Sequence, residues 1–142
     1  MKWKRNCFRW IDLVLSRNIR QKSMNPSLIP FQSIDWSSLP KTEHPGETGT
    51  SHWQTLQLPG LRIRIVEYSP GYRADHWCSL GHVVYCLEGE FISEMQDGSS
   101  FSLNKGMSYV VSDKLSSHRS FSRSGATLLI VDGNFLSSKE LK

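Results

Sequence analysis

The sequence predicts an all-β domain, folded as an antiparallel sandwich or a closed barrel. Three observations lead to this fold class. From residue 50 onward, apolar residues recur with a period of two, which is the period of a strand with one buried face. Gly, Pro, Asp and Ser divide this region into short runs. No segment after residue 50 carries an apolar stripe long enough for three turns of helix.

The first expected strand covers residues 61–65, where apolar and basic side chains alternate. Turn residues flank it at 59–60 and 69–71. Because an alternating strand has one wet face, we expect Arg62 and Arg64 to point into water. If their face lines the cavity instead, the two arginines could bind an acidic ligand. Before this strand, residues 37–51 are almost entirely polar, which predicts a long loop.

The middle and end of the chain predict further short strands. Residues 82–87 and 91–96 are expected as two strands that a turn at Glu88-Gly89 separates, and Asp97-Gly98 marks a tight hairpin. Four more short apolar runs follow, at residues 101–103, 107–111, 118–121 and 126–131.

The size and composition fit one small folded domain. The chain has 142 residues, of which 38% are hydrophobic and 11% aromatic, enough to fill a core. No apolar run approaches the roughly 18 residues of a membrane-spanning helix. Three cysteines are too few for a disulfide-stapled secreted scaffold, so we expect a reduced protein of the cytoplasm.

The positive charge lies at the amino-terminal end. Residues 1–23 hold seven Lys and Arg but one acidic residue, and residues 24–142 carry a net negative charge although the whole chain has a net charge of +4. A basic face for nucleic acid is therefore not expected on the domain. We interpret residues 1–23 as a dispensable extension, disordered or partly helical, with Met24 as the natural start, and residues 24–142 as the folded domain.

One group of residues has the chemistry of a metal site: His76, Cys78, His82 and His118. On a strand, residues two apart share a face, so the first two side chains point the same way. A turn at residues 79–81 brings His82 onto the next strand, and His118 arrives on a later one. Imidazole and thiolate bind divalent transition metals, and we expect one ion, Zn or Fe(II).

The segment from Gly71 to Gly89 resembles the first motif of the cupin superfamily, G-x-x-x-x-x-H-x-H-x-x-x-E-x-x-x-x-x-x-G. His76 and Cys78 stand at its two His positions, and His82 stands at its Glu position. Residues 106–118 resemble the second motif, without its usual Pro and Gly. The run Asp-His-Trp-Cys at residues 75–78 is more similar still to the small group of DHCW-motif cupins.

The resemblance runs from about residue 24 to residue 132. It implies a double-stranded β-helix, the jelly-roll barrel of cupins, with a metal ion held at the motif positions. It also implies a homodimer, because cupin barrels bury their edges partly by pairing and residues 25–36 are free to cross to a neighbour.

Four other residues are candidates for the pocket. Cys86 shares the face of His82 by parity, so it is expected in the wall, and a disulfide between Cys78 and Cys86 is not expected. Glu67 or Tyr68 must face inward, and Tyr109 is a candidate for the aromatic wall.

Several functions remain open from the sequence. The protein is a metal-dependent enzyme acting on a small molecule, a small-molecule binding or sensor module with or without metal, or a barrel with a purely structural zinc site. A nucleophilic Cys–His hydrolase fits the spacing less well. Neither nucleic acid nor membrane is an expected partner.

Overall fold

The computed structural model of the chain describes residues 28–137, and the extension expected at residues 1–23 lies outside them. Strands dominate this part of the chain, which confirms the all-β class. Helix is confined there to two three-residue 3-10 turns, η1 (Trp36–Ser38) and η2 (Asn134–Leu136). Among the described residues, no helix is long and apolar enough to cross a membrane.

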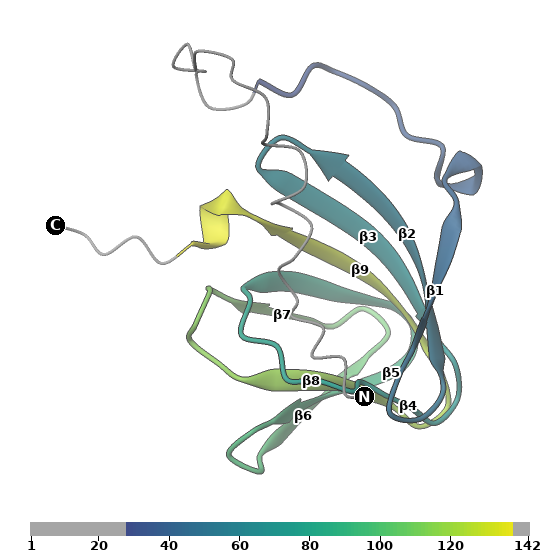
Figure 1. Cartoon of the computed structure of the whole chain (residues 1–142), viewed down its shortest axis with the longest axis vertical. Coiled ribbons are helices and arrows are strands. Elements are labelled where there is room, and N and C mark those ends of the chain that lie inside the picture. Colours follow the sequence, from purple (N-terminus) through teal and green to yellow (C-terminus); the bar gives the residue numbers. More distant parts are fainter. Residues whose placement is uncertain (1–27, 138–142) are drawn as a thin grey trace, which may run out of the picture.

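The strands form one antiparallel sheet that curls into a barrel, as Figure 1 shows. Its path runs β1-β2-β3-β9-β5-β8-β4, and β6 and β7 pair with β5 beside that path. The first wall holds the first half of β5 together with β1 (Lys41–Pro45), β2 (Thr50–Leu58), β3 (Leu61–Tyr68), β7 (Ser108–Val111) and β9 (Ala126–Gly133).

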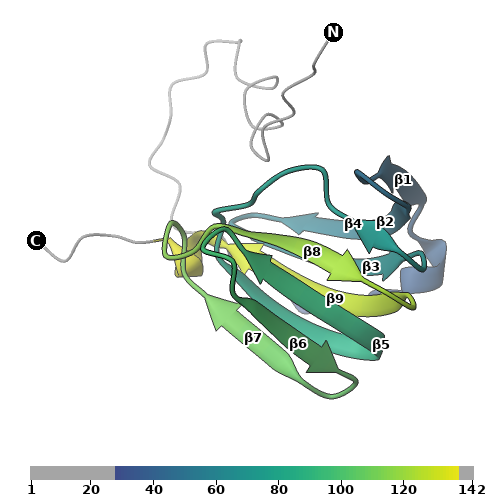
Figure 2. The same cartoon turned by 90° about the horizontal axis from the view of Figure 1, so that it is seen from below.

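The second wall contains the other half of β5 (His82–Met95) with β4 (Tyr72–Arg73), β6 (Ser100–Asn104) and β8 (His118–Ser122). Both β6 and β7 follow β5 along one side of the barrel (Figure 2). A bridge between Thr48 and Arg73 joins the loop after β1 to β4, so the two ends of the sheet path meet. The expected jelly-roll barrel is therefore confirmed.

The strand β5 corrects the prediction of two strands with a turn between them. It runs unbroken for 14 residues, and its pairing with β9 shifts register between Cys86 and Glu88. Gly89 lies there with a φ of 77°. The Glu88-Gly89 pair is thus a bulge that bends one strand from the first wall into the second.

The strand β3 alternates as expected but in the opposite phase. Arg64, Val66 and Tyr68 are buried on the inner face, whereas Ile63 and Ile65 are only partly buried on the outer face. The prediction that the arginines face water is wrong. The reason is a buried acidic partner on the neighbouring strand β9, described below.

The prediction of a long loop at residues 37–51 is also wrong. Residues 41–45 form the strand β1, and residue 50 already begins β2. The polar composition reflects an edge strand with mostly exposed side chains, which pairs through its backbone with β2. His44 on this strand stacks against Trp53, with 4.1 Å between the ring centroids.

The core fills the barrel between the two walls. Its fully buried side chains include Val66, Val84, Cys86, Phe91 and Leu128. The predicted shared face of β5 is confirmed, because His82, Val84 and Cys86 are all buried. The apolar core thus occupies one part of the interior and leaves the His82 end for polar residues.

We expect Gly89→Ala to destabilise the protein more than Gly98→Ala. Both glycines have positive φ, so each alanine carries a strain of about 1–3 kcal/mol. A Cβ at Gly89 also meets the Gly125 carbonyl oxygen, whereas a Cβ at Gly98 meets nothing within 4 Å. Urea unfolding of the two variants measures the difference, and equal losses would contradict the role of the bulge.

Candidate metal centre

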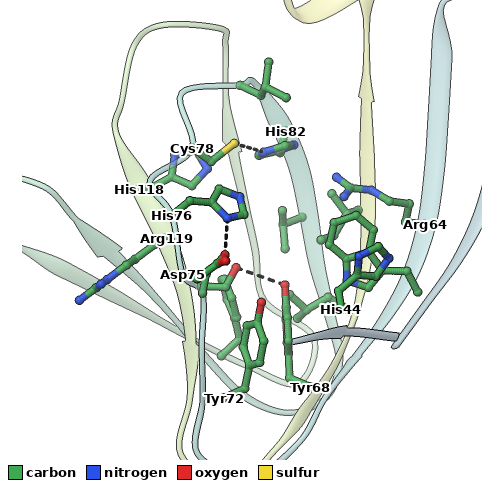
Figure 3. A pocket seen from close by; sticks show the side chains of 18 of the residues that line it. His44, Arg64, Tyr68, Tyr72, Asp75, His76, Cys78, His82, His118 and Arg119 are labelled. Carbon is green, nitrogen blue, oxygen red and sulfur yellow. Dashed lines mark hydrogen bonds and ion pairs between the residues drawn. The ribbon is translucent and has the colours of Figure 1, made fainter. Parts of the chain in front are cut away.

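Three of the four predicted ligands come together inside the barrel. Cys78 lies in the segment before β5, His82 is the first residue of β5, and His118 is the first residue of β8. Backbone hydrogen bonds of 2.7 and 2.9 Å join Cys78 to His118 in both directions. One ligand atom from each of the three side chains lies within 4.8 Å of the others (Figure 3).

The spacing of Cys78 and His82 and the hydrogen bonding of His118 fit a transition metal. Two ligand atoms on a tetrahedral zinc ion lie about 3.3–3.8 Å apart, given bonds of about 2.0–2.3 Å. The Cys78 Sγ and the His82 Nε2 are 3.5 Å apart. The His118 Nδ1 lies 2.8 Å from the Ser116 hydroxyl, while its Nε2 is buried without a hydrogen-bond partner among the described residues. A bound ion would satisfy that nitrogen.

A buried carboxylate stands behind His82. The Asp132 Oδ1 lies 3.9 Å from the His82 Nδ1, on the side of the ring away from Cys78. A carboxylate facing one imidazole nitrogen favours a proton there and leaves the other nitrogen free to bind metal. Arg62 and Arg64 hold this carboxylate, the first through an Nη2 contact of 2.6 Å and the second through one of 3.0 Å.

His76 lines the same cavity but lies outside the three-residue cluster. Its Nδ1 is 2.6 Å from the Asp75 Oδ1, and its side chain is partly exposed. In Figure 3 the ring lies between the Cys78–His118 pair and the tyrosines. Its role as a fourth ligand stays a prediction.

The cluster opens into a cavity of about 310 Å³, and two of the predicted pocket residues line it. Tyr68 and Tyr109 stand in its wall, and the Tyr68 hydroxyl donates to the Ser120 hydroxyl at 3.2 Å. Burial raises the pKa of Tyr68 to about 12 and also raises the pKa of Tyr109. Both phenols therefore stay protonated at neutral pH and serve as hydrogen-bond donors rather than bases.

The other two pocket candidates lie elsewhere. Cys86 is buried in the apolar core, where its thiol contacts the Glu88 and Gly89 carbonyl oxygens at 3.5 Å, and burial raises its pKa. Neither Cys78 nor Cys86 forms a disulfide, as expected. The Glu67 carboxylate forms an exposed ion pair with the Lys41 ammonium group at 2.7 Å. Of the Glu67–Tyr68 pair, it is the tyrosine that faces inward.

Sequence reasoning missed Asp132 and misplaced Arg64. The signal for the first was an acidic residue at the end of the apolar run 126–131, in phase with Leu128 and Ile130. The signal for the second appears only once β3 and β9 are known to be neighbours. In that pairing Arg62 stands directly opposite Asp132.

We expect Asp132→Ala to lower the free energy of unfolding by about 3–5 kcal/mol, because it leaves two arginines together without their counter-ion. The control is Glu88→Ala, which removes an exposed ion pair to Lys105 and should cost less than about 1 kcal/mol. Urea unfolding compares the two. Losses of similar size would contradict a structural role for the buried carboxylate.

The sequence comparisons find no relative. No family model matches this chain, and no curated protein matches it. The fold comparisons, in contrast, find many solved structures of similar architecture.

Three of those structures show the similarity of fold. Ectoine synthase from P. lautus is 21% identical, with a TM-score of 0.58 over 75% of this chain and 79% of its own. A predicted oxalate decarboxylase from Thermotoga maritima is 14% identical, with a TM-score of 0.62 over 72% and 98%. An RmlC-like cupin from Shewanella frigidimarina is 19% identical, with a TM-score of 0.59 over 77% and 94%. At these identities the likeness concerns the fold alone, and this chain shares the barrel fold of these three structures.

Proposed function

We propose that this protein binds one divalent transition-metal ion through Cys78, His82 and His118 and holds a small molecule beside that ion. The observation that carries the proposal is the meeting of three ligand atoms at the wall of a cavity, beside a His118 Nε2 that is buried without a hydrogen-bond partner among the described residues. Three protein ligands leave a coordination position for water or a bound molecule.

The residues around the cluster have separate tasks in this proposal. Asp132 and Ser116 orient the two imidazoles, and the Tyr109 phenol offers a hydrogen bond to an oxygen atom of the bound molecule. The Tyr68 phenol donates its proton to Ser120 and can accept a hydrogen bond. The ion, when bound, supplies Lewis-acid chemistry to an oxygen atom held against it. The same arrangement serves an enzyme or a binding and sensor module, and both remain within the proposal.

A purely structural zinc site is the alternative. It needs a fourth protein ligand, and His76 is the candidate because it lines the same cavity. The opening of the cluster into about 310 Å³ of space favours a position left for a ligand. The ligand set favours zinc, since thiolate is a soft ligand, and Fe(II) is the second candidate.

The narrower assignments are proposals of the same kind. The Asp-His-Trp-Cys run at residues 75–78 supports a place among the DHCW-motif cupins. The absence of a disulfide between the two described cysteines supports a reducing compartment such as the cytoplasm.

We expect elemental analysis of the purified protein to find close to one zinc or iron ion per chain. Cys78→Ser, His82→Ala and His118→Ala should each remove most of that metal, because two remaining ligands hold an ion weakly. The matched control is Cys86→Ser, a cysteine on the same strand face as His82 but in the core, which should keep the metal.

Full metal content in all three ligand variants would refute the proposed site. His76→Ala separates the two remaining functions. Loss of metal in His76→Ala, together with no exchangeable ligand on the bound ion, would support a structural zinc site instead.

We also propose that the protein forms a homodimer through the outer face of the first wall. Directly paired positions of four strands carry apolar side chains on this face, and Val110 and Tyr85 are 70% and 40% exposed there. A continuous apolar patch of this kind is self-complementary and suits a two-fold contact. Its residues are Ile63, Ile65, Val83, Tyr85, Val110, Leu129 and Val131.

Light scattering at micromolar concentration should give twice the chain mass for the full chain, and Val110→Glu should give a monomer. Deletion of residues 1–23 should leave both the dimer and the melting temperature nearly unchanged. A monomeric full chain would contradict the dimer. Loss of folded protein on deletion would contradict the dispensable extension and would favour that segment as the cover of the apolar face.

A further inference from the structure

Arg64 is a charged side chain buried in the cavity wall. It projects from the inner face of β3, its side chain is only 7% exposed, and its guanidinium lies 4.8 Å from the Trp53 ring centroid. Figure 3 shows it across the cavity from Cys78 and His118. A buried arginine of this kind needs a full set of negative partners.

The partners of Arg64 are incomplete. Its Nη2 contacts the Asp132 Oδ1 at 3.0 Å, but its Nε is buried without a hydrogen-bond partner among the described residues. Arg62 occupies the other oxygen of the same carboxylate, with an Nε contact of 2.8 Å. Two arginines therefore share one negative charge, and within residues 28–137 one positive charge stays uncompensated.

The surrounding groups do not supply the missing charge. The Asp75 carboxylate, which also lines the cavity, is engaged by His76. Glu94 and Glu47 lie against Arg119, a different arginine at the cavity edge. Burial, with a smaller contribution from Arg62, lowers the pKa of Arg64, and the Asp132 carboxylate opposes this shift only in part.

We propose that Arg64 is the anchor for the carboxylate group of a small organic acid bound in the cavity. The planar guanidinium matches a carboxylate, and a single surplus positive charge matches a single negative one. Tyr68, Tyr72 and Trp53 line the cavity beside it and suit the carbon skeleton of such an acid.

This subsite lies next to the candidate metal centre. Arg64 and His82 both face the Asp132 Oδ1, so an acid bound to the guanidinium has its other end directed toward the ion. That last step rests on the proposed function, whereas the anchoring of the carboxylate at Arg64 does not.

The experiment compares benzoate with benzamide, a neutral molecule of the same shape, on the full-length protein. Trp53 reports binding through its fluorescence because it lies against the guanidinium, and Trp53→Phe should remove the signal. Both probes are titrated before and after treatment with a chelator. The variants are Arg64→Gln and, as a matched loss of charge on an exposed residue, Arg123→Gln.

We expect benzoate to bind at least about tenfold more tightly than benzamide, with or without metal, since hydrogen bonds to a charged group are worth about 1.5–3 kcal/mol. Arg64→Gln should abolish this preference, and Arg123→Gln should keep it. Benzoate that binds no better than benzamide, or a preference that survives Arg64→Gln, overturns the inference. Displacement of benzoate by inorganic phosphate at lower concentrations than by acetate overturns the choice of a carboxylate.

A replacement variant and the dependence on metal cover the remaining outcomes. If circular dichroism shows that Arg64→Gln is unfolded, Arg64→Lys replaces it, and an unchanged benzoate affinity there overturns the inference. A preference for benzoate that requires metal and is unchanged in the Arg64 variants places the carboxylate on the ion. This result refutes the inference but supports the proposed function. A preference that depends on Arg64, in a protein that elemental analysis finds to hold no metal as purified, supports this inference and contradicts the proposed function.

Discussion

Asp132 is a carboxylate on the inner face of β9, where an unpaired negative charge would cost several kcal/mol. The neighbouring strand must therefore present cations to the interior, and β3 does so with Arg62 and Arg64. Because Asp132 needs these cations, Ile63 and Ile65 face outward and one end of the barrel interior is polar. The same carboxylate faces His82, so one buried charge connects the strand phase, the cavity wall and the candidate metal centre.

The continuous strand β5 positions the cluster within the barrel. Its first residue is His82, and its second half pairs with β8, whose first residue is His118. The bulge at Gly89 bends the strand so that both walls share it, and the two imidazoles meet with their rings nearly perpendicular, 5.4 Å between centroids. Cys78 enters from the segment before β5 and is held to His118 by backbone hydrogen bonds. Candidate ligands far apart in the chain thus lie on adjoining backbone segments.

The cavity has two chemically different ends joined by aromatic walls. On one side the thiol and imidazoles offer metal ligands, and on the facing side of the wall Arg64 offers a positive charge. The protonated phenols of Tyr68 and Tyr109 stand between the core and this space. Such an arrangement can hold a small molecule at two points and fix its orientation, which is the first requirement for either selective binding or catalysis.

Local patterns in the sequence determined the β class, most strand positions and the Asp97-Gly98 turn, because strand period and turn chemistry are properties of neighbouring residues. The same patterns pointed to Cys78, His82 and His118 as candidate metal ligands, because ligand chemistry belongs to the residue type. The motif spacing also pointed to His76, which the fold leaves beside the cluster in contact with Asp75. Only the tertiary structure revealed Asp132 as the partner of His82 and the outward phase of Ile63. The physical reason is that the alternation of apolar and polar residues defines the two faces of a strand without saying which face turns inward. For β3 that choice depends on Asp132, which lies on the neighbouring strand β9, 70 residues from Arg62.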